Sequence, residues 1–146
     1  MRTDDPSAIA AALAPFRTAI LTTRGEDGQL RSRPMAMRHA LRGEELWFAT
    51  AADSAKCRDL EHDARCAVVF FDSASGTTVS VSGHGEVIRD RKLTASLWDR
   101  SWERWVPAGI EPSEVVLLRV IPHLVERHDG GTGRLEVIFQ SVRRGG

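Results

Sequence analysis

The sequence has few cysteines and no long apolar segment. Its two cysteines, Cys57 and Cys66, form no Cys-x-x-Cys pair, so we expect two buried free thiols and no disulfide framework. No stretch approaches the roughly 18 apolar residues of a membrane span, and the apolar run near the N-terminus is too short and interrupted for a signal peptide. We therefore expect a cytoplasmic protein without a membrane partner.

An excess of charge of one sign is also missing. Lysine and arginine together number 20, as do aspartate and glutamate, so the formal net charge is zero. Proteins that bind nucleic acid by neutralising its phosphates usually have a basic excess, and we expect no nucleic-acid partner. With 42% apolar and 27% charged residues, the composition is typical of a globular protein, and we expect one domain over residues 1–146.

Several well-known functional motifs are absent from the sequence. Gly83-His84-Gly85 lies in a strand pattern, and the glycines at 130–133 precede no helical pattern, which excludes a Rossmann site and a P-loop. His84 and Glu86 share one strand face, but two ligands do not make a metal site, and we expect no metal. No serine stands in a nucleophile elbow, so we assign no catalytic residue.

The sequence does contain short β-rich segments separated by turn residues. We expect strands at 17–23, 30–41, 45–50, 66–71, 77–89, 115–121, 124–128 and 135–139, and helices beginning at Asp5, at Asp53 or Ser54 and at Asp90. Hairpins join the strands and βαβ units do not, so the sheet should be mainly antiparallel. A sheet formed by about six or seven of these segments, with small peripheral helices, favours a closed barrel.

The second predicted strand contains several arginines. Alternation along a strand places Arg31 and Arg33 on one face with Met35 and Met37, and Arg38 on the other. The arginines have two interpretations: the solvated face of an edge strand, or the wall of a half-polar pocket. The methionines on the same face favour the pocket.

The helix predicted near residue 54 begins with a lysine. Thr50 ends the preceding strand, and Ser54 and Lys56 open the helix. A helix N-terminus binds anions through its free N–H groups and its dipole, and a lysine adds a positive charge. The alternative is an ordinary N-cap by Asp53 or Ser54. Together with the arginines, this pattern favours a phosphorylated ligand.

The third predicted helix carries three tryptophans within eight residues. Trp98, Trp102 and Trp105 follow helical spacing, and the helix should end at Pro107. A solvated helix would not carry them, so this face is buried in the domain, against a partner subunit or over a ligand. We expect core or dimer packing.

Several of these segments, in order along the chain, resemble the pyridoxamine 5′-phosphate oxidase-like split β-barrels, in particular the general stress protein 26 branch. They are residues 27–35 (DGQLRSRPM), 46–56 (LWFATAADSAK), 79–87, 97–109 and 115–130. The resemblance implies an antiparallel split β-barrel and a homodimer with FMN bound at the subunit interface.

The resemblance also implies cofactor contacts on the second strand. Arg33 and Arg38 match the two basic positions beside the FMN phosphate. Pro34, Met35 and Ala36 match a segment that runs beside the isoalloxazine ring and offers backbone groups to it.

Further cofactor contacts implied by the resemblance lie in three other segments. Thr50 matches a threonine that contacts the flavin. Ser54 and Lys56 match the serine and lysine of a phosphate-binding Ser-Arg-Lys, but Ala55 replaces the arginine. Thr78 stands where the partner chain supplies a flavin-contacting glutamine.

The C-terminal part departs from the oxidase pattern. His128 replaces a flavin-binding tryptophan, and Arg134-Leu135-Glu136-Val137-Ile138 replaces the closing Arg-Leu-His-x-Arg. Glu136 would repel a substrate phosphate, so we do not expect oxidation of pyridoxamine phosphate. The missing arginines at positions 55 and 138 predict a weakly held flavin.

The sequence thus predicts an FMN-dependent oxidoreductase of the general stress protein 26 type. It would use an unidentified small-molecule substrate or a nicotinamide electron donor. The alternatives are a non-catalytic flavin-binding stress or carrier module, and a related barrel that binds FAD, a deazaflavin or haem.

Overall fold

A computed structural model describes residues 5, 7–36, 41–42, 44–98 and 114–141. It contains one eight-stranded sheet in the order β2-β1-β5-β6-β7-β4-β3, with β8 paired to β7 and every pairing antiparallel. The strands are β1 (Thr18–Arg24), β2 (Leu30–Ala36), β3 (Leu41–Arg42), β4 (Glu45–Ala51), β5 (Arg65–Phe71), β6 (Thr78–Ile88), β7 (Val115–His128) and β8 (Leu135–Gln140). The helices are α1 (Ser7–Leu13), α2 (Ala55–His62) and α3 (Arg91–Leu97).

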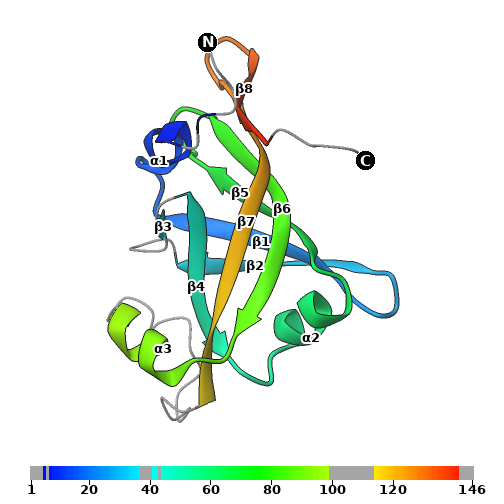
Figure 1. Cartoon of the computed structure of the whole chain (residues 1–146). Coiled ribbons are helices and arrows are strands. Elements are labelled where there is room, and N and C mark those ends of the chain that lie inside the picture. The colour runs from blue at the N-terminus through cyan, green and yellow to red at the C-terminus, as the bar shows by residue number, and fades with distance from the viewer. Residues whose placement is uncertain (1–4, 6, 37–40, 43, 99–113, 142–146) are drawn as a thin grey trace.

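The sheet curves around its main apolar core, with β1 and β2 running across β4, β6 and β7 (Figure 1). Strand β1 alternates buried and exposed residues, with Ala19 and Leu21 fully buried. These side chains meet Phe48, Phe70 and Leu118 from other strands. Helix α1 adds Ile9 and Leu13 to this core, and α2 adds Cys57 and Leu60. No helix within the described ranges is long and apolar enough to cross a bilayer.

The predicted second strand, 30–41, is wrong as a single strand. Strand β2 ends at Ala36, residues 37–40 lie outside the described residues, and Leu41–Arg42 form β3. These two strands stand at opposite ends of the pairing order. Five residues span at most about 18 Å, so the two edges of the sheet must approach each other here, as a barrel requires.

The two strands predicted at 115–121 and 124–128 form the single strand β7, which continues through the buried Pro122. The β6–β7 register shifts at this point, so Gly83 faces Pro122, Ser82 faces Leu124, and His123 is an extra, bulged residue. Proline has no N–H group to donate to the neighbouring strand, and a bulge allows the strand to continue without that hydrogen bond. A Cβ on Gly83 would lie 2.2 Å from the Ile121 carbonyl oxygen, so only glycine permits this close approach.

The third helix is shorter than its tryptophan spacing predicts. Asp90 caps it, accepting a 3.0 Å bond from the Leu93 N–H, as expected. The helix ends at Leu97, because Trp98 takes a non-helical ψ of 131°; the prediction of a continuous helix past this residue is wrong. Trp98 packs against a small apolar cluster that contains Trp47, which confirms core packing for it, whereas Trp102 and Trp105 lie outside the described residues.

Candidate functional site

The inner face of β2 changes from apolar to charged along the strand. Met35 is 3% exposed, the Arg33 side chain is 19% exposed, and the Arg31 side chain is 49% exposed and pairs with Asp27 at 2.6 Å. The β1–β2 hairpin extends beyond the barrel past α2 (Figure 1). The residues on this face of β2 are therefore more exposed the nearer they lie to the hairpin turn. The predicted common face of Arg33 and Met35 is confirmed, and both side chains are shielded there, while Arg31 is solvated.

Arg33 is fixed by two residues from other elements. Its Nη1 donates to the Thr23 hydroxyl at 2.6 Å, and its Nη2 lies 3.6 Å from Asp59 Oδ2. The Thr23 hydroxyl in turn donates to Asp59 Oδ2 at 2.8 Å. Burial lowers the pKa of Arg33, while the Asp59 carboxylate acts in the opposite direction. The guanidinium therefore has a counter-ion within its own chain.

Helix α2 begins beside this arginine. Ser54, one of the two N-cap residues that the sequence predicts, is its N-cap residue, and Asp63 is its C-cap residue. The Ser54 side chain makes no capping bond and donates to Cys57 Sγ at 3.3 Å. Among the described residues, no hydrogen bond engages the backbone N–H groups of Ala55 and Lys56. The helix N-terminus therefore keeps unused donors.

Lys56 is a half-buried cation. Its Nζ donates to the Thr50 hydroxyl at 2.8 Å, and Thr50 is itself buried at the end of β4. Burial lowers the pKa of Lys56, and the nearby positive charge of Arg33 lowers it further. Within the part of the chain that the structure describes, no carboxylate contacts Lys56. We call Arg33, Thr50, Ser54 and Lys56 the cation cluster.

The remaining predicted contacts lie elsewhere. Pro34 is exposed on the opposite face of β2 from Arg33, and Ala36 ends β2. Arg38 lies outside the described residues. Thr78 begins β6 opposite Phe71 and His128, and the chain does not bring it to its own cation cluster.

Both thiols are free, as expected: Cys57 is fully buried and Cys66 partly so. Burial raises the pKa of both, that of Cys66 to about 12. Neither is therefore a thiolate at neutral pH.

The C-terminal hairpin forms a second polar feature. Its residues line a hollow of about 430 Å³: Arg127, Asp129, Thr132, Arg134, Leu135 and Glu136. Arg127 lies 3.9 Å from Asp129 and opposite Glu136 in the β7–β8 register. Two arginines and two carboxylates share this hollow, so its formal charge is balanced.

Sequence reasoning missed three residues at these sites. Thr23 and Asp59 are distant from Arg33 along the chain, although Asp59 follows Lys56 by three residues, about one helical turn. His123 gave no signal, because only the bulge brings it to His84, whose Nδ1 lies 2.7 Å from His123 Nε2. The described residues contain no group of three or more metal-ligating side chains.

The family of the chain follows from its whole length. The sequence profile described as pyridoxamine 5′-phosphate oxidase like matches residues 4–145. The chain belongs to this family. Protein bli-3 of Neurospora crassa is 33% identical over a 99-residue alignment that covers 64% of this chain and 47% of that protein. The match thus spans about half of the length of the Neurospora protein.

Solved structures share the fold at low identity. A protein related to general stress protein 26 from Clostridium acetobutylicum superposes with a TM-score of 0.74 and 17% identity, covering 91% of this chain and 94% of that one. An FMN-binding protein related to the oxidase, from Nostoc punctiforme, gives a TM-score of 0.69 and 17% identity, covering 90% and 87%. The predicted family and the split β-barrel are confirmed.

The same fold serves several cofactors. An F420 reductase has a TM-score of 0.64 at 21% identity, covering 80% of this chain and 94% of that one. A haem-binding protein from Mycobacterium smegmatis has a TM-score of 0.67 at 18% identity, covering 94% and 57%. The fold alone therefore does not choose the cofactor, and the choice rests on the side chains of this chain.

Proposed function

We propose that the protein binds FMN through its phosphate at the cation cluster and acts as an FMN-dependent oxidoreductase. One observation carries the proposal: Lys56 is a half-buried cation at a helix N-terminus without a carboxylate partner in the described residues. A positive charge there is unfavourable with the helix dipole unless an anion joins it. A phosphate would neutralise Lys56 and accept hydrogen bonds from the N–H groups of Ala55 and Lys56.

The residues around Lys56 fit a phosphate monoester. Ser54 is the N-cap residue of α2, two positions before Lys56, and Arg33 on β2 is close enough for its positive charge to lower the Lys56 pKa. Charge-assisted hydrogen bonds of this kind are stronger than neutral ones. Strand β2 ends the pairing order, so the backbone of Pro34, Met35 and Ala36 can run beside the flavin ring. The flavin supplies the electron or hydride transfer when bound; the chain binds and orients it.

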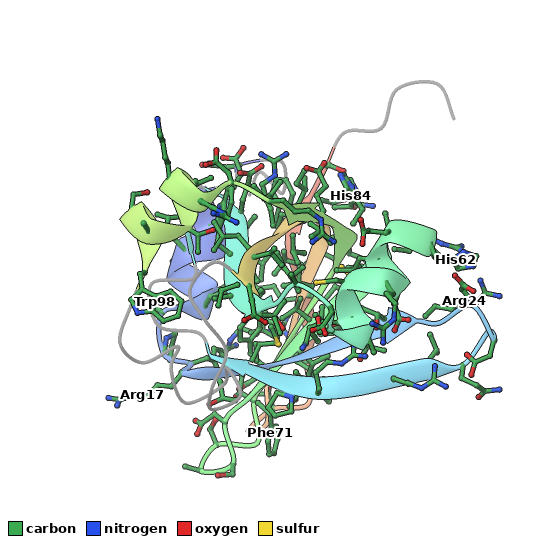
Figure 2. The ribbon with its side chains drawn as sticks, turned by 90° about the horizontal axis from the view of Figure 1, so that it is seen from below. Arg17, Arg24, His62, Phe71, His84 and Trp98 are labelled. Carbon is green, nitrogen blue, oxygen red and sulfur yellow. The ribbon has the colours of Figure 1, made fainter. Side chains whose placement is uncertain are left out.

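A second copy of the chain would complete the site. Ile20 is 38% exposed, Phe71 60% and Leu135 63%, and Phe71 points away from the core (Figure 2). The register places Phe71 beside Thr78, which lies beside His128 and then Leu135. Large apolar residues on a sheet face are typical of an interface. In the proposed homodimer, Thr78 of one protomer contacts the flavin held by the cation cluster of the other.

The balanced charge of the C-terminal hollow argues against a phosphorylated substrate. Arg127 and Arg134 are matched there by Asp129 and Glu136, so no excess positive charge remains for a second phosphate. This supports a substrate other than pyridoxamine phosphate. It equally supports a second candidate function, a flavin-holding module that has no dedicated substrate.

Ligand titration tests the cofactor. We expect the fluorescence of FMN to be quenched when it binds to the protein. FMN should bind about 10- to 100-fold more tightly than riboflavin, because charge-assisted bonds to phosphate contribute roughly 1.5–3 kcal/mol. Equal affinity for the two flavins, or no binding of either, would refute the phosphate site. The visible spectrum of the purified protein separates flavin from deazaflavin F420 and haem.

Two further measurements test the proposed catalysis and the proposed dimer. Turnover with NADH or a panel of oxidants supports the oxidoreductase, whereas a bound flavin that never turns over supports the module. A solution mass of two chains supports the shared site, and a monomer that binds FMN fully contradicts it.

A further inference from the structure

Asp59 is a nearly buried carboxylate on the face of α2 that meets β1 and β2. It is 8% exposed, and its Oδ2 both accepts from the Thr23 hydroxyl at 2.8 Å and lies 3.6 Å from Arg33 Nη2. Thr23 is only 1% exposed and joins the two charged groups by also accepting from Arg33 at 2.6 Å. Three elements thus fix one ion pair at the edge of the cation cluster.

The charges near this pair do not cancel. Arg33 and Lys56 each contribute one positive charge, and Asp59 contributes one negative charge, so the three residues carry a net charge of about +1 by formal counting. A phosphate monoester near neutral pH carries about −1.5 to −2. With Asp59 present, the net positive charge of these three residues is therefore smaller than the negative charge of the phosphate.

The ion pair has a clear role when no phosphate is bound. Burial disfavours the charged form of Arg33, and Asp59 offsets that effect. Without the carboxylate, a partly buried guanidinium would face the positive charges of Arg31 and Lys56, and these like charges would destabilise the folded protein. With it, Arg33 keeps one orientation and its charge.

We propose that Asp59 is a built-in counter-ion that limits the affinity of the cation cluster for phosphate. It holds Arg33 in place in the ligand-free protein and opposes the negative charge of a bound phosphate. The inference rests on the proposed FMN phosphate site and adds to it: the cofactor is held loosely enough to exchange, and Asp59 sets that affinity. In the ligand-free protein, the Asp59 carboxylate provides the negative charge beside Arg33 that the phosphate would otherwise provide.

The test measures the affinities for FMN and for riboflavin, which lacks the phosphate, in the wild type and in the Asp59→Asn variant. The amide keeps the shape of the side chain and can still accept the hydrogen bond from the Thr23 hydroxyl, but it removes the negative charge beside Arg33. We expect the affinity for FMN to rise at least about tenfold, since one opposing charge is removed from the cluster, while the affinity for riboflavin changes less than about threefold. The FMN-loaded variant should also show a larger thermal shift on loading than the wild type.

Asp63→Asn is the matched control. Asp63 ends the same helix and pairs with Arg24 at 3.4 Å and Arg65 at 2.8 Å, away from the cation cluster; Figure 2 shows Arg24 near His62, at that end of α2. Its loss should leave the ratio of FMN to riboflavin affinity unchanged. Asp59→Glu keeps the charge and should not raise the affinity for FMN.

The flavin affinities and the folding of Asp59→Asn decide whether Asp59 limits the affinity for phosphate. An FMN affinity that is unchanged or lower in Asp59→Asn, or an equal rise for both flavins, overturns the inference. If the variant folds only with ligand, rescue by FMN or inorganic phosphate but not by riboflavin supports the inference, and failure to fold in saturating FMN overturns it. A wild type that does not prefer FMN to riboflavin refutes the proposed function instead, and is recognised before any variant is made.

Discussion

Replacing Lys56 by methionine separates a ligand-binding lysine from a structural one. Methionine keeps an unbranched side chain of similar length and removes only the charge and the donor. Among the described residues of the ligand-free protein, the lysine makes one side-chain hydrogen bond, 2.8 Å long, to the Thr50 hydroxyl. Losing a single bond of this kind costs about 1 kcal/mol.

Two gains offset that loss. A positive charge in the first turn of α2 opposes the helix dipole, which costs about 0.3–1 kcal/mol. Burial also disfavours the charged amine, as the lowered pKa of Lys56 shows, and removing that charge contributes a gain of similar size. We therefore expect the free energy of unfolding of ligand-free Lys56→Met to stay within about 1 kcal/mol of the wild type.

The effect on FMN should be much larger. A charge-assisted bond to phosphate contributes roughly 1.5–3 kcal/mol, so the affinity for FMN should fall about 10- to 100-fold. Riboflavin affinity should not change. Fluorescence titration with both flavins gives the affinities, and urea unfolding with comparison of the m-values gives the stability.

The exposed Lys92 on α3 is the control, because Lys92→Met removes a lysine charge far from the cation cluster. It should change neither flavin affinity nor stability. Two results would refute the reasoning: a Lys56→Met protein that unfolds about 2 kcal/mol more easily, since the lysine would then be structural, or one that binds FMN as the wild type does.

Three further predictions follow from other parts of the structure. Because burial and a neighbouring arginine lower the pKa of Lys56 below its usual 10.5, the preference for FMN over riboflavin should depend on pH and be largest where Lys56 is protonated. It should be lost as the pH rises through that lowered value; a ratio that stays constant up to about pH 10 contradicts this. Gly83→Ala should lower the free energy of unfolding by about 2 kcal/mol, because its Cβ would lie 2.2 Å from the Ile121 carbonyl. Gly131→Ala, with 3.9 Å to its nearest neighbour, should cost less than about 0.5 kcal/mol in the same urea titration. Phe71→Asp should convert the proposed dimer to a monomer in a solution-mass measurement; an unchanged mass would exclude this sheet face as the interface.

The sequence predicted local features of the site well. Alternation along a strand follows from covalent geometry, so Arg33 and Met35 could be assigned to one face before their neighbours were known. The Ser54 N-cap and the position of Lys56 in the first turn of α2 are also local features. These residues required no tertiary contact for their prediction.

The missed features all depend on contacts between distant segments. Asp59 reaches Arg33 only because α2 packs against the β1–β2 hairpin. The helical pattern of the sequence alone is equally compatible with an exposed carboxylate at position 59. Pro122 normally ends a strand, and the sequence could not show that a bulge opposite Gly83 lets β7 continue. Helical spacing likewise predicted α3 past Trp98, where packing against Trp47 accompanies a non-helical backbone.

The charges of the two polar features together constrain the proposed chemistry. The cation cluster and Asp59 leave one positive charge for the cofactor phosphate, and the C-terminal hollow has none in excess. An oxidase acting on a phosphorylated substrate would need an excess of positive charge at both places. The distribution instead favours an exchangeable flavin that passes electrons to or from an uncharged acceptor, because the two arginines at the hollow are already matched by two carboxylates.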